Sequence, residues 1–405
     1  MIFLKIKGDN LINFFVAIFL TSSIFLLSFD NVLWAKFWST LKIPPNYIPF
    51  SDFKAHLSFL ECYKQFINIY SEECYLINQG NAKISTHPKI WIHLFDLLNL
   101  KNKFIYHLVI YILLFAYLYL FFSFKKNFTK KNEKIFFYFF FLSTSNFLLI
   151  ERLSTDLIIF LVIWCIVFSS NKIVKISFIY LGFILKYYPI FLLSLFIKQK
   201  KYFFGIILIF IFIFFIFFLN DTKNINKNIV EMALPIAYGS RTMLKALYHL
   251  SENYSLFLND SNYNFYRNCV VIFFTIYSIL LIIYGYLKIQ KLNLNTEFSE
   301  QFIAGASIYL GTYIIGANAD YRLIFLLFTL PLVFQLKNKL LKNTYLISVF
   351  FSINSFYFLL GDKISLIFFI TSIVIFCLKF LIFSILSLII GSQLKKINFF
   401  KFKNV

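Results

Sequence analysis

Three short groups of ionisable residues, together with Asp52 in the segment SDF of the first loop, lie beside the apolar runs of the chain. Arg152 and Asp156 lie in the segment IERLSTDL, Lys186 lies beside a proline in LKYYP, and Asp320 and Arg322 lie in GANADYRL. Ionisable groups between apolar runs at a membrane boundary are costly and often functional. Each group also has a simpler interpretation: a local ion pair, a snorkelling lysine beside a proline kink, or an interfacial turn. Arg152 and Asp156 are four residues apart, so on one helix they would share a face.

The composition places these residues in a membrane protein. Of the 405 residues, 60% are apolar and 22% are aromatic, whereas only 14% are charged. A soluble protein of this size could not bury so many hydrophobic side chains. A net charge of +21 would suggest nucleic acid in a soluble protein, but here the basic residues must first be sorted by membrane side. We therefore expect membrane lipid around the chain and no nucleic-acid partner.

The apolar runs have lengths typical of transmembrane helices. A bilayer core needs about 20 apolar residues per helix, and an open strand cannot satisfy its backbone in lipid. The sequence therefore predicts an all-α polytopic integral membrane protein of the cell membrane, with residues 1–405 as one membrane domain and about 10 to 12 transmembrane helices. The apolar runs cover residues 11–29, 104–123, 135–150, 157–170, 173–197, 203–219, 268–287, 302–316, 322–336, 344–360 and 364–390.

The distribution of charge predicts the orientation. Lys5 and Lys7 place the N-terminus in the cytoplasm, because cytoplasmic loops carry an excess of Lys and Arg. The long loop 30–103 is then extracytoplasmic, and the lysine-rich segment 125–134 returns to the cytoplasm. The second long loop, 220–267, is also predicted to be extracytoplasmic, and the C-terminus cytoplasmic. All but four of the 18 acidic residues fall on the outer side, which indicates a polar working surface there; the exceptions are Asp9, Glu133, Glu297 and Glu300.

Residues 173–197 contain Lys186 and Pro189 near their middle. Their length favours one span, but a single crossing would place the downstream basic segments outside, against the charge rule. Proline disfavours helix at the preceding Tyr188. We therefore expect two short helices that meet at an outward-facing break at Lys186 to Pro189. Such a break is tolerated only where protein or a polar cavity surrounds it.

The cysteines and histidines predict no metal site. Cys62 and Cys74 share the first long loop, and they could form a disulfide if that loop is extracytoplasmic. His87 and His93 are six residues apart in the same loop, a spacing that does not indicate a metal. The chain also has no Gly-rich phosphate loop, which disfavours a nucleotide-using enzyme. We expect neither a cofactor nor a metal.

The order of the charged elements resembles the polytopic glycosyltransferases of the GT-C superfamily, particularly glycosyltransferase family 87. The resemblance rests on an early outer-loop aspartate in SDF, then ERLSTDLIIF, GFILKYYPIFLL and NADYRLIFLLFTLPL, over residues 50–335. It implies a GT-C-like fold and an inverting hexosyltransferase of the cell envelope. The donor would be a polyprenyl-phosphate sugar, such as mannose, and the acceptor a glycan or lipid on the extracytoplasmic face. The chain departs from the pattern at Leu153, where relatives commonly have glycine.

The resemblance also assigns roles to single residues. Asp52 would be the general base that takes the proton of the acceptor hydroxyl, and Asp30, nearer the first helix, is the competing candidate. The basic side chains would stabilise the departing lipid phosphate, and the tyrosines would line the sugar or lipid entrance or act as interfacial aromatics. We expect these side chains to converge in one outer cavity, within about 10 to 15 Å. The predicted substrate-binding residues are Arg152, Asp156, Lys186, Tyr187, Asp320 and Arg322.

Two other functions stay open at this point. A polymerase or ligase of lipid-linked oligosaccharides would need an essential arginine in the second long loop, where Arg241 lies. Separate substitutions of Asp52 and Arg241 would discriminate between the two enzymes. A transporter would be expected to show interrupted helices in matching halves, and the sequence shows one interrupted helix with no convincing partner.

Overall fold

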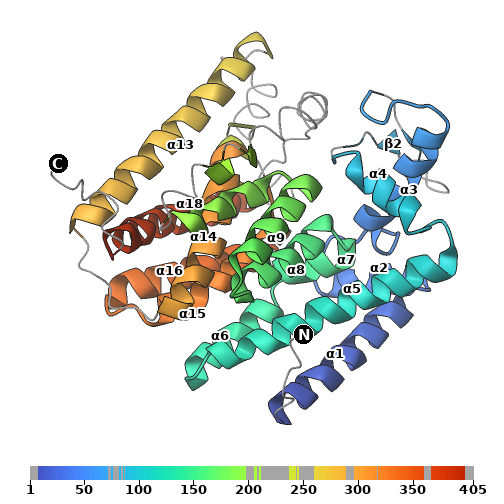
Figure 1. Cartoon of the computed structure of the whole chain (residues 1–405), viewed down its shortest axis with the longest axis horizontal. Coiled ribbons are helices and arrows are strands. Elements are labelled where there is room, and N and C mark those ends of the chain that lie inside the picture. Colours follow the sequence, from blue (N-terminus) through green and yellow to red (C-terminus); the bar gives the residue numbers. More distant parts are fainter. Residues whose placement is uncertain are drawn as a thin grey trace. The chain divides into compact units, whose positions relative to one another are not determined.

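The structure is a computed structural model that describes residues 8–71, 74–75, 82–83, 85, 87–197, 205–207, 209–210, 237–242, 244–245, 260–288, 296–316, 318–359 and 366–396. The described chain is mostly helical, with two short pairs of strands (Figure 1). It divides into two compact units. The first unit takes its residues from 1–138, 147–189 and 208–229, and the second unit from 139–146, 190–207 and 230–405.

Several helices have the length and composition of membrane spans. In the described chain, three are long and apolar enough to cross a membrane: Lys103–Asn127, Phe265–Lys288 and Ile370–Lys395. A fourth span results if Lys131–Phe141 and Thr144–Arg152, bent by 41° at a short break, are counted together. The helical, membrane-type character predicted from the sequence is therefore confirmed for this part of the protein.

The first unit is built mainly from helices of the first half of the chain. Helix α5 shows why they begin where they do, since Asn102 accepts hydrogen bonds from the backbone N–H groups of Phe104 and Ile105 as its N-cap. The elements are α1 (Gly8–Leu27), α2 (Asn31–Thr40), α3 (Ser51–Lys64), β1 (Cys74–Tyr75), β2 (Ala82–Lys83), α4 (Ile90–Leu97), α5 (Lys103–Ser123), the 3-10 helix η1 (Phe124–Asn127), α6 (Lys131–Phe141), α7 (Thr144–Arg152), α8 (Thr155–Phe168) and α9 (Lys172–Leu185). Residues 139–146, where α6 meets α7, belong to the second unit.

Helices α1 and α5 lie side by side and antiparallel (Figure 1). Near one end the Asn13 side chain donates to the carbonyl of Phe122, over 3.4 Å. Towards the other end the hydroxyls of Ser22 and Tyr111 are 3.1 Å apart. Inside a membrane the hydrophobic effect does not drive helices together, so side-chain hydrogen bonds of this kind and close packing hold them together instead.

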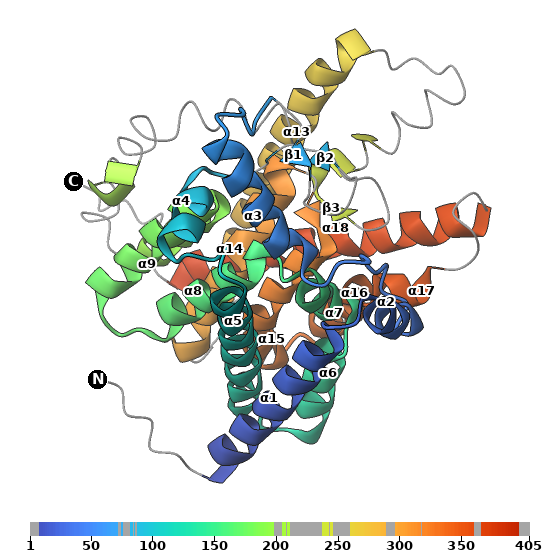
Figure 2. The same cartoon turned by 90° about the vertical axis from the view of Figure 1, so that its right-hand side faces the viewer.

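The predicted loop 30–103 is largely helical. Helix α2 is capped by Asp30, whose carboxylate accepts from the N–H groups of Val32 and Leu33. Helices α3 and α4 lie next to each other (Figure 2), joined through the rings of Phe53 and Phe95 at 4.8 Å. Full burial of one such side chain is worth about 1.5–3 kcal/mol.

A disulfide closes part of this first loop. Cys62, near the end of α3, is joined to Cys74 in β1, with a Cα–Cα distance of 6.1 Å. Strand β1 pairs antiparallel with β2 in the same segment. The disulfide that the sequence left open is therefore present in the structure.

The second unit contains the remaining described elements. They are the 3-10 helix η2 (Tyr188–Phe196), whose first two residues belong to the first unit, β3 (Ala237–Tyr238), α13 (Asp260–Lys288), α14 (Thr296–Ile315), β4 (Asn318–Ala319), the 3-10 helix η3 (Asp320–Thr329), α15 (Leu330–Phe334), α16 (Lys339–Ile353), α17 (Ser355–Phe358) and α18 (Leu366–Lys396). Strand β3 pairs antiparallel with β4. Most of the predicted helix 203–219 and of the predicted loop 220–267 lies outside the described residues.

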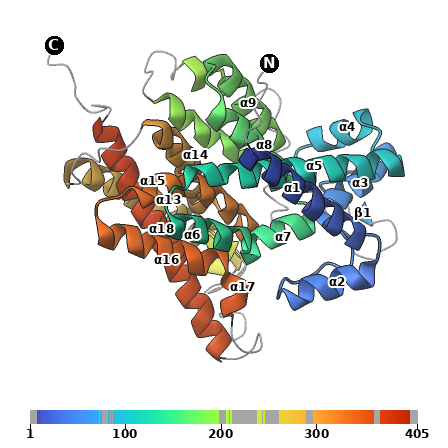
Figure 3. The same ribbon diagram turned by 90° about the horizontal axis from the view of Figure 1, so that it is seen from below.

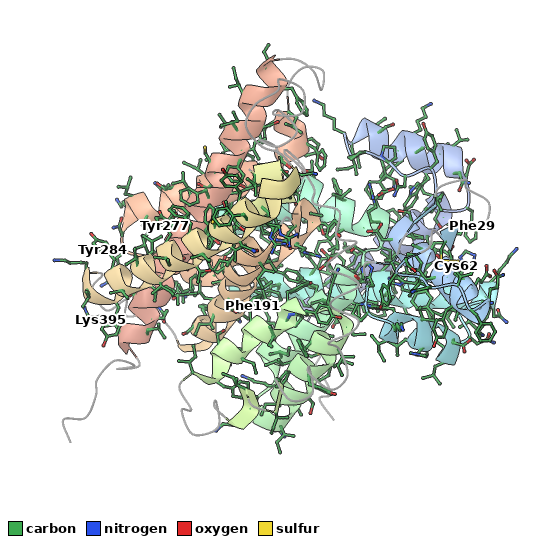
Figure 4. All side chains as sticks on the ribbon, turned by 90° about the horizontal axis from the view of Figure 1, so that it is seen from above. Phe29, Cys62, Phe191, Tyr277, Tyr284 and Lys395 are labelled. Atoms are coloured by element: carbon green, nitrogen blue, oxygen red, sulfur yellow. A yellow bond between two sulfur atoms is a disulfide. The ribbon has the colours of Figure 1, made fainter. Side chains whose placement is uncertain are left out.

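Helices α13 and α18 approach each other closely at two glycines (Figures 3 and 4). A Cβ atom on Gly285 would overlap the carbonyl oxygen of Leu388, and one on Gly391 would overlap that of Ile282. The hydroxyls of Ser278 and Ser387 lie 3.1 Å apart across the same interface. Small residues and hydroxyl contacts of this kind are typical of packed helices in a membrane.

Candidate functional site

The predicted base, Asp52, lies in the first turn of α3 and faces an arginine. Its Oδ1 is 3.9 Å from Nη1 of Arg152, at the C-terminal end of α7. The two side chains are 24% and 27% exposed, respectively. A carboxylate and a guanidinium from distant parts of the sequence therefore form a partly open ion pair, at which a ligand can reach both groups.

A fully buried carboxylate, Glu151, supports this pair. Arg152 Nε donates to its Oε2 over 2.9 Å, and the backbone N–H of Asn46 donates to its Oε1 over 2.8 Å. The backbone N–H of Phe50 donates to the Glu151 carbonyl over 3.2 Å. A buried charge requires such partners to offset its lost hydration. Glu151 therefore holds the segment before α3 against the end of α7. Glu151 was not among the predicted site residues, although it neighbours Arg152.

Two residues beside the pair have left-handed backbone conformations. Phe50, directly before α3, has φ of +58°, and Leu153, directly after α7, has φ of +43°. Both side chains are buried. For a residue other than glycine this conformation costs about 1–3 kcal/mol, and such strain concentrates at ligand and active sites.

The predicted helix face shared by Arg152 and Asp156 is wrong. Helix α7 ends at Arg152, and α8 begins at Thr155 with Ser154 as its N-cap. The left-handed turn at Leu153 separates the two side chains. Arg152 therefore pairs with Asp52 and Glu151, and Asp156 takes part in a second, buried network.

That network is centred on Asp156, which is fully buried. Lys186 Nζ donates to its Oδ2 over 2.5 Å and to Oγ1 of Thr155 over 2.8 Å. The hydroxyl of Tyr188 donates to its Oδ1, and Ser154 Oγ lies 3.2 Å from its Oδ2. Asp156 thus neutralises Lys186 and accepts further hydrogen bonds, as a buried ion pair requires.

The break predicted at Lys186 is confirmed. Helix α9 ends at Leu185, Lys186 is extended with φ of −158°, and the 3-10 helix η2 begins at Tyr188. The sequence placed Tyr187 among the substrate-binding residues. Its ring packs against Phe183 at 6.0 Å, whereas the adjacent Tyr188 binds Asp156.

Two histidines extend the network to α3 and α4. His56, one turn after Asp52 on α3, stacks on Trp91 with 5.1 Å between ring centres, and lies 4.8 Å from the ring of His87. His87 Nε2 is 3.3 Å from Oγ1 of Thr155. Burial, and then the positive charge of Lys186, lowers the pKa of His56 to about 3, so this imidazole is neutral at physiological pH. Groups of three or more potential metal ligands are absent from the described residues.

In the second unit, Asp320 forms a closed ion pair with Lys379. Lys379 Nζ donates to Oδ1 and Oδ2 of Asp320 over 2.7 and 2.8 Å, and both side chains are fully buried. Ser355 Oγ donates to the same carboxylate over 2.8 Å, and Lys379 also donates to the carbonyl of Ala237 over 3.1 Å. Lys379 was not among the predicted site residues, although a lysine inside the apolar run 364–390 was a visible signal.

Arg322 lies two residues beyond Asp320 and is half-buried. Its Nη1 donates to the side-chain oxygen of Asn318 in β4. The α-helix expected over residues 322–336 is mainly the 3-10 helix η3, followed by the short helix α15. Arg241, the candidate of the polymerase interpretation, follows β3 and is also half-buried.

The two breaks have related sequences. KYYPIFLL begins at Lys186 and DYRLIFLL begins at Asp320, so both have tyrosine in second place and end in IFLL. Lys186 directly follows helix α9 and Asp320 directly follows strand β4, and both segments continue as 3-10 helices. The expectation of one interrupted helix with no convincing partner stays a prediction.

Four of the site residues, Asp52, Arg152, Asp156 and Lys186, lie in one connected region of the first unit. Arg152 pairs with Asp52, and Lys186 pairs with Asp156. Helix α3 connects the two pairs, because it carries both Asp52 and His56, whose pKa is lowered by the charge of Lys186. Asp320 and Arg322 belong to the second unit, so their convergence with Asp52 stays a prediction. Comparison with known proteins adds no relative: no family model, no curated protein and no solved structure matches the chain.

Proposed function

We propose that the chain is a multi-pass glycosyltransferase of the cell membrane. It transfers a sugar, such as mannose, from a polyprenyl-phosphate donor to a glycan or lipid acceptor on the extracytoplasmic face. The observation that carries the proposal is the partly exposed pair of Asp52 and Arg152, supported from behind by buried Glu151. The proposal includes a GT-C-like fold of about 10 to 12 spans with both termini in the cytoplasm.

Burial distinguishes Asp52 from the other acids as the base. Glu151 and Asp156 are fully buried and saturated with donors, so an acceptor hydroxyl cannot reach them. Asp30 is exposed, but its carboxylate caps the N-terminus of α2. A general base must come within hydrogen-bond reach of the proton that it takes. Asp52, about a quarter exposed at a helix end, meets that condition.

Inversion needs the base beside the acceptor hydroxyl on one face of the anomeric carbon, and a cation beside the phosphate that departs from the opposite face. Asp52 takes the proton of the acceptor hydroxyl, and the acceptor oxygen forms its bond to the anomeric carbon with inversion. The bond between that carbon and the phosphate oxygen breaks, and polyprenyl phosphate leaves with an additional negative charge. The guanidinium of Arg152, whose Nε is held by Glu151 and which is partly exposed, stabilises this charge through its Nη groups.

Lys186 has a different part in this proposal from the one expected. Because Asp156 neutralises it, Lys186 does not supply a free positive charge to the phosphate. Together with Asp156, Thr155 and Tyr188, it fixes the start of α8 against the end of α9. That network positions the turn at Leu153, and through it Arg152. A glycine, common at this place in the resembling family, would adopt the left-handed conformation of Leu153 without strain.

The test is transfer of labelled mannose from polyprenyl-phosphate mannose by the purified protein in proteoliposomes. Asp52→Asn should reduce transfer by about 10²- to 10⁴-fold, the usual contribution of a general base. Asp96→Asn is the matched control, because Asp96 is an exposed acid of the same unit that pairs with Lys64. Transfer by Asp52→Asn at the wild-type rate would refute the proposal.

A transporter is the second candidate, because two segments of the chain, beginning at Lys186 and Asp320, have similar sequences and both continue as 3-10 helices. Interrupted segments at corresponding places are typical of transporter substrate sites. Wild-type proteoliposomes distinguish the candidates. Uptake of solute without release of polyprenyl phosphate would favour transport, and product formation without uptake would favour transfer.

A further inference from the structure

The lysine-rich segment 125–134 forms a turn at a membrane boundary. The candidate span Lys103–Asn127 ends in this segment, and α6, the first half of the bent candidate span, begins in it at Lys131. The segment carries five lysines and a single acid, Glu133. A turn between two spans lies at the depth of the lipid head groups, so these charges lie at the surface of the bilayer.

Aromatic rings pack the turn against the helices beneath it. Phe124, Phe128 and Phe137 are at most 1% exposed, and the ring centre of Phe128 lies 5.8 Å from that of Phe124 and 5.4 Å from that of Phe137. Oε2 of Glu133 accepts from the backbone N–H groups of the two residues that precede α6, over 3.0 and 3.2 Å. The turn is therefore packed, and its one carboxylate is bonded to its own backbone.

The lysines of this turn are not neutralised by acids. The ion pairs of the described chain involve other residues. Nζ of Lys125 lies 5.2 Å from the ring centre of Tyr138, and Nζ of Lys126 lies 5.7 Å from that of Phe168. Such contacts hold a cation in place without removing its charge. The exposed lysines of the turn are Lys126, Lys130 and Lys131.

An exposed apolar face continues from these lysines along α6. Ile135 and Tyr138 follow Lys131 by four and seven residues, so the three side chains share one face of the helix. Ile135 is 44% exposed and Tyr138 is 39% exposed. A phospholipid has the same order of chemistry, because its phosphate lies at the bilayer surface and its acyl chains run inward. The turn and this face therefore match a lipid in both charge and apolar surface.

We propose that the turn binds an anionic phospholipid such as phosphatidylglycerol. The ammonium groups of Lys130 and Lys131 contact its phosphate, and an acyl chain lies along Ile135 and Tyr138. Charge selects the lipid, because phosphatidylcholine brings a quaternary ammonium group that the five lysines repel. Near an anionic membrane surface each lysine strengthens binding roughly fivefold. This binding needs only the membrane boundary, and neither the proposed transferase activity nor a particular orientation of the chain.

Native mass spectrometry of the purified full chain tests the proposal. The protein is equilibrated in mixed micelles with equal amounts of phosphatidylglycerol and phosphatidylcholine, and the lipids retained after detergent washing are counted. Wild type should retain phosphatidylglycerol over phosphatidylcholine by about tenfold or more. Lys130→Gln with Lys131→Gln should lower retained phosphatidylglycerol by about 10- to 30-fold, as the loss of two lysines implies. Lys130→Arg with Lys131→Arg, which keeps both charges, should retain this lipid as the wild type does.

Lys36→Gln with Lys42→Gln is the matched control. It removes the same charge from two exposed lysines, one in α2 and one directly after it. Because α1 and α5 are antiparallel, α2 and the lysine-rich turn lie at opposite ends of this helix pair (Figure 1). Exposed charges that far apart are screened from each other, so the control should retain phosphatidylglycerol within about twofold of wild type.

Four results would overturn the proposal. They are equal or absent retention of the two lipids by wild type, equal retention of phosphatidylglycerol by wild type and the glutamine pair, an equal loss in the control pair, or displacement of the lipid by inorganic phosphate. The last result would assign the turn to a soluble anion. If the glutamine pair does not fold, as judged by its thermal unfolding, the comparison of the two lipids on wild type decides alone.

Discussion

The buried pair of Asp320 and Lys379 gives a quantitative prediction for the second unit. Both carboxylate oxygens accept from the ammonium, and neither side chain is exposed. Lys379→Met would leave a buried carboxylate with Ser355 as its main donor. Breaking a buried pair by removing one partner destabilises a protein by about 3–5 kcal/mol. We expect a loss of that size from Lys379→Met, and a similar loss from Asp320→Leu.

The double variant should be far more stable than the sum of the two losses implies. In Asp320→Leu with Lys379→Met, no charge remains buried, and replacing a buried pair by apolar side chains is often neutral. The carbonyl of Ala237 still loses its donor, which costs about 1 kcal/mol. We therefore expect the double variant to lie within about 1–2 kcal/mol of wild type.

Equilibrium unfolding in mixed micelles, followed by circular dichroism, would measure these differences. The exposed Lys337→Met serves as the control. If the two single losses simply added in the double variant, the side chains would not interact and the described pair would be incorrect. Transfer activity of the stable double variant would show in addition whether Asp320 contacts substrate, as the sequence predicted, or only supports the fold.

Three further predictions concern packing, pH and covalent structure. Gly285→Leu should separate α13 from the Leu388 backbone and lower the unfolding temperature, and an unchanged temperature would contradict the close approach. The pKa of His56 is lowered from 6.5 to about 3. Below pH 6.5 the unfolded chain therefore binds a proton that the folded protein does not, and the free energy of unfolding falls by about 1.4 kcal/mol for each pH unit. His56→Phe should flatten this slope in thermal unfolding measured from pH 7 to 5, and an unchanged slope would assign it to other groups. Cys62→Ser should remove the bond to Cys74 and cost about 3 kcal/mol for a loop of this length; equal stability of oxidised and reduced wild type would oppose this.

The long apolar helices could be predicted because one signal determines them. The runs 11–29, 104–123 and 268–287 correspond to α1, α5 and the apolar part of α13, since in each a long hydrophobic stretch is bounded by polar residues. The break at Lys186 was predictable because Pro189 excludes helix just before it. The break at Leu153 carries no proline or glycine, so the sequence suggested a continuous helix over Arg152 and Asp156.

The partners of the site residues were harder to predict because they are distant in sequence. Arg152 and Asp52 are joined only by the fold, and so are Asp320 and Lys379. Hydropathy also cannot separate an α-helix from a 3-10 helix of the same composition, so η2 and η3 were not expected. One feature of the sequence could have indicated that His56 belongs to the site: it lies one helical turn after the candidate base Asp52 on α3.

The most direct test of the proposed function is the fate of the donor in a single-turnover reaction. The purified wild type and Asp52→Asn are incubated with polyprenyl-phosphate mannose and a cell-envelope acceptor fraction, and the anomeric configuration of the product is read by proton NMR. Wild type should release polyprenyl phosphate and give a mannoside of inverted configuration, whereas Asp52→Asn should give neither. A product of retained configuration, or equal product from the folded Asp52→Asn protein, would contradict the account.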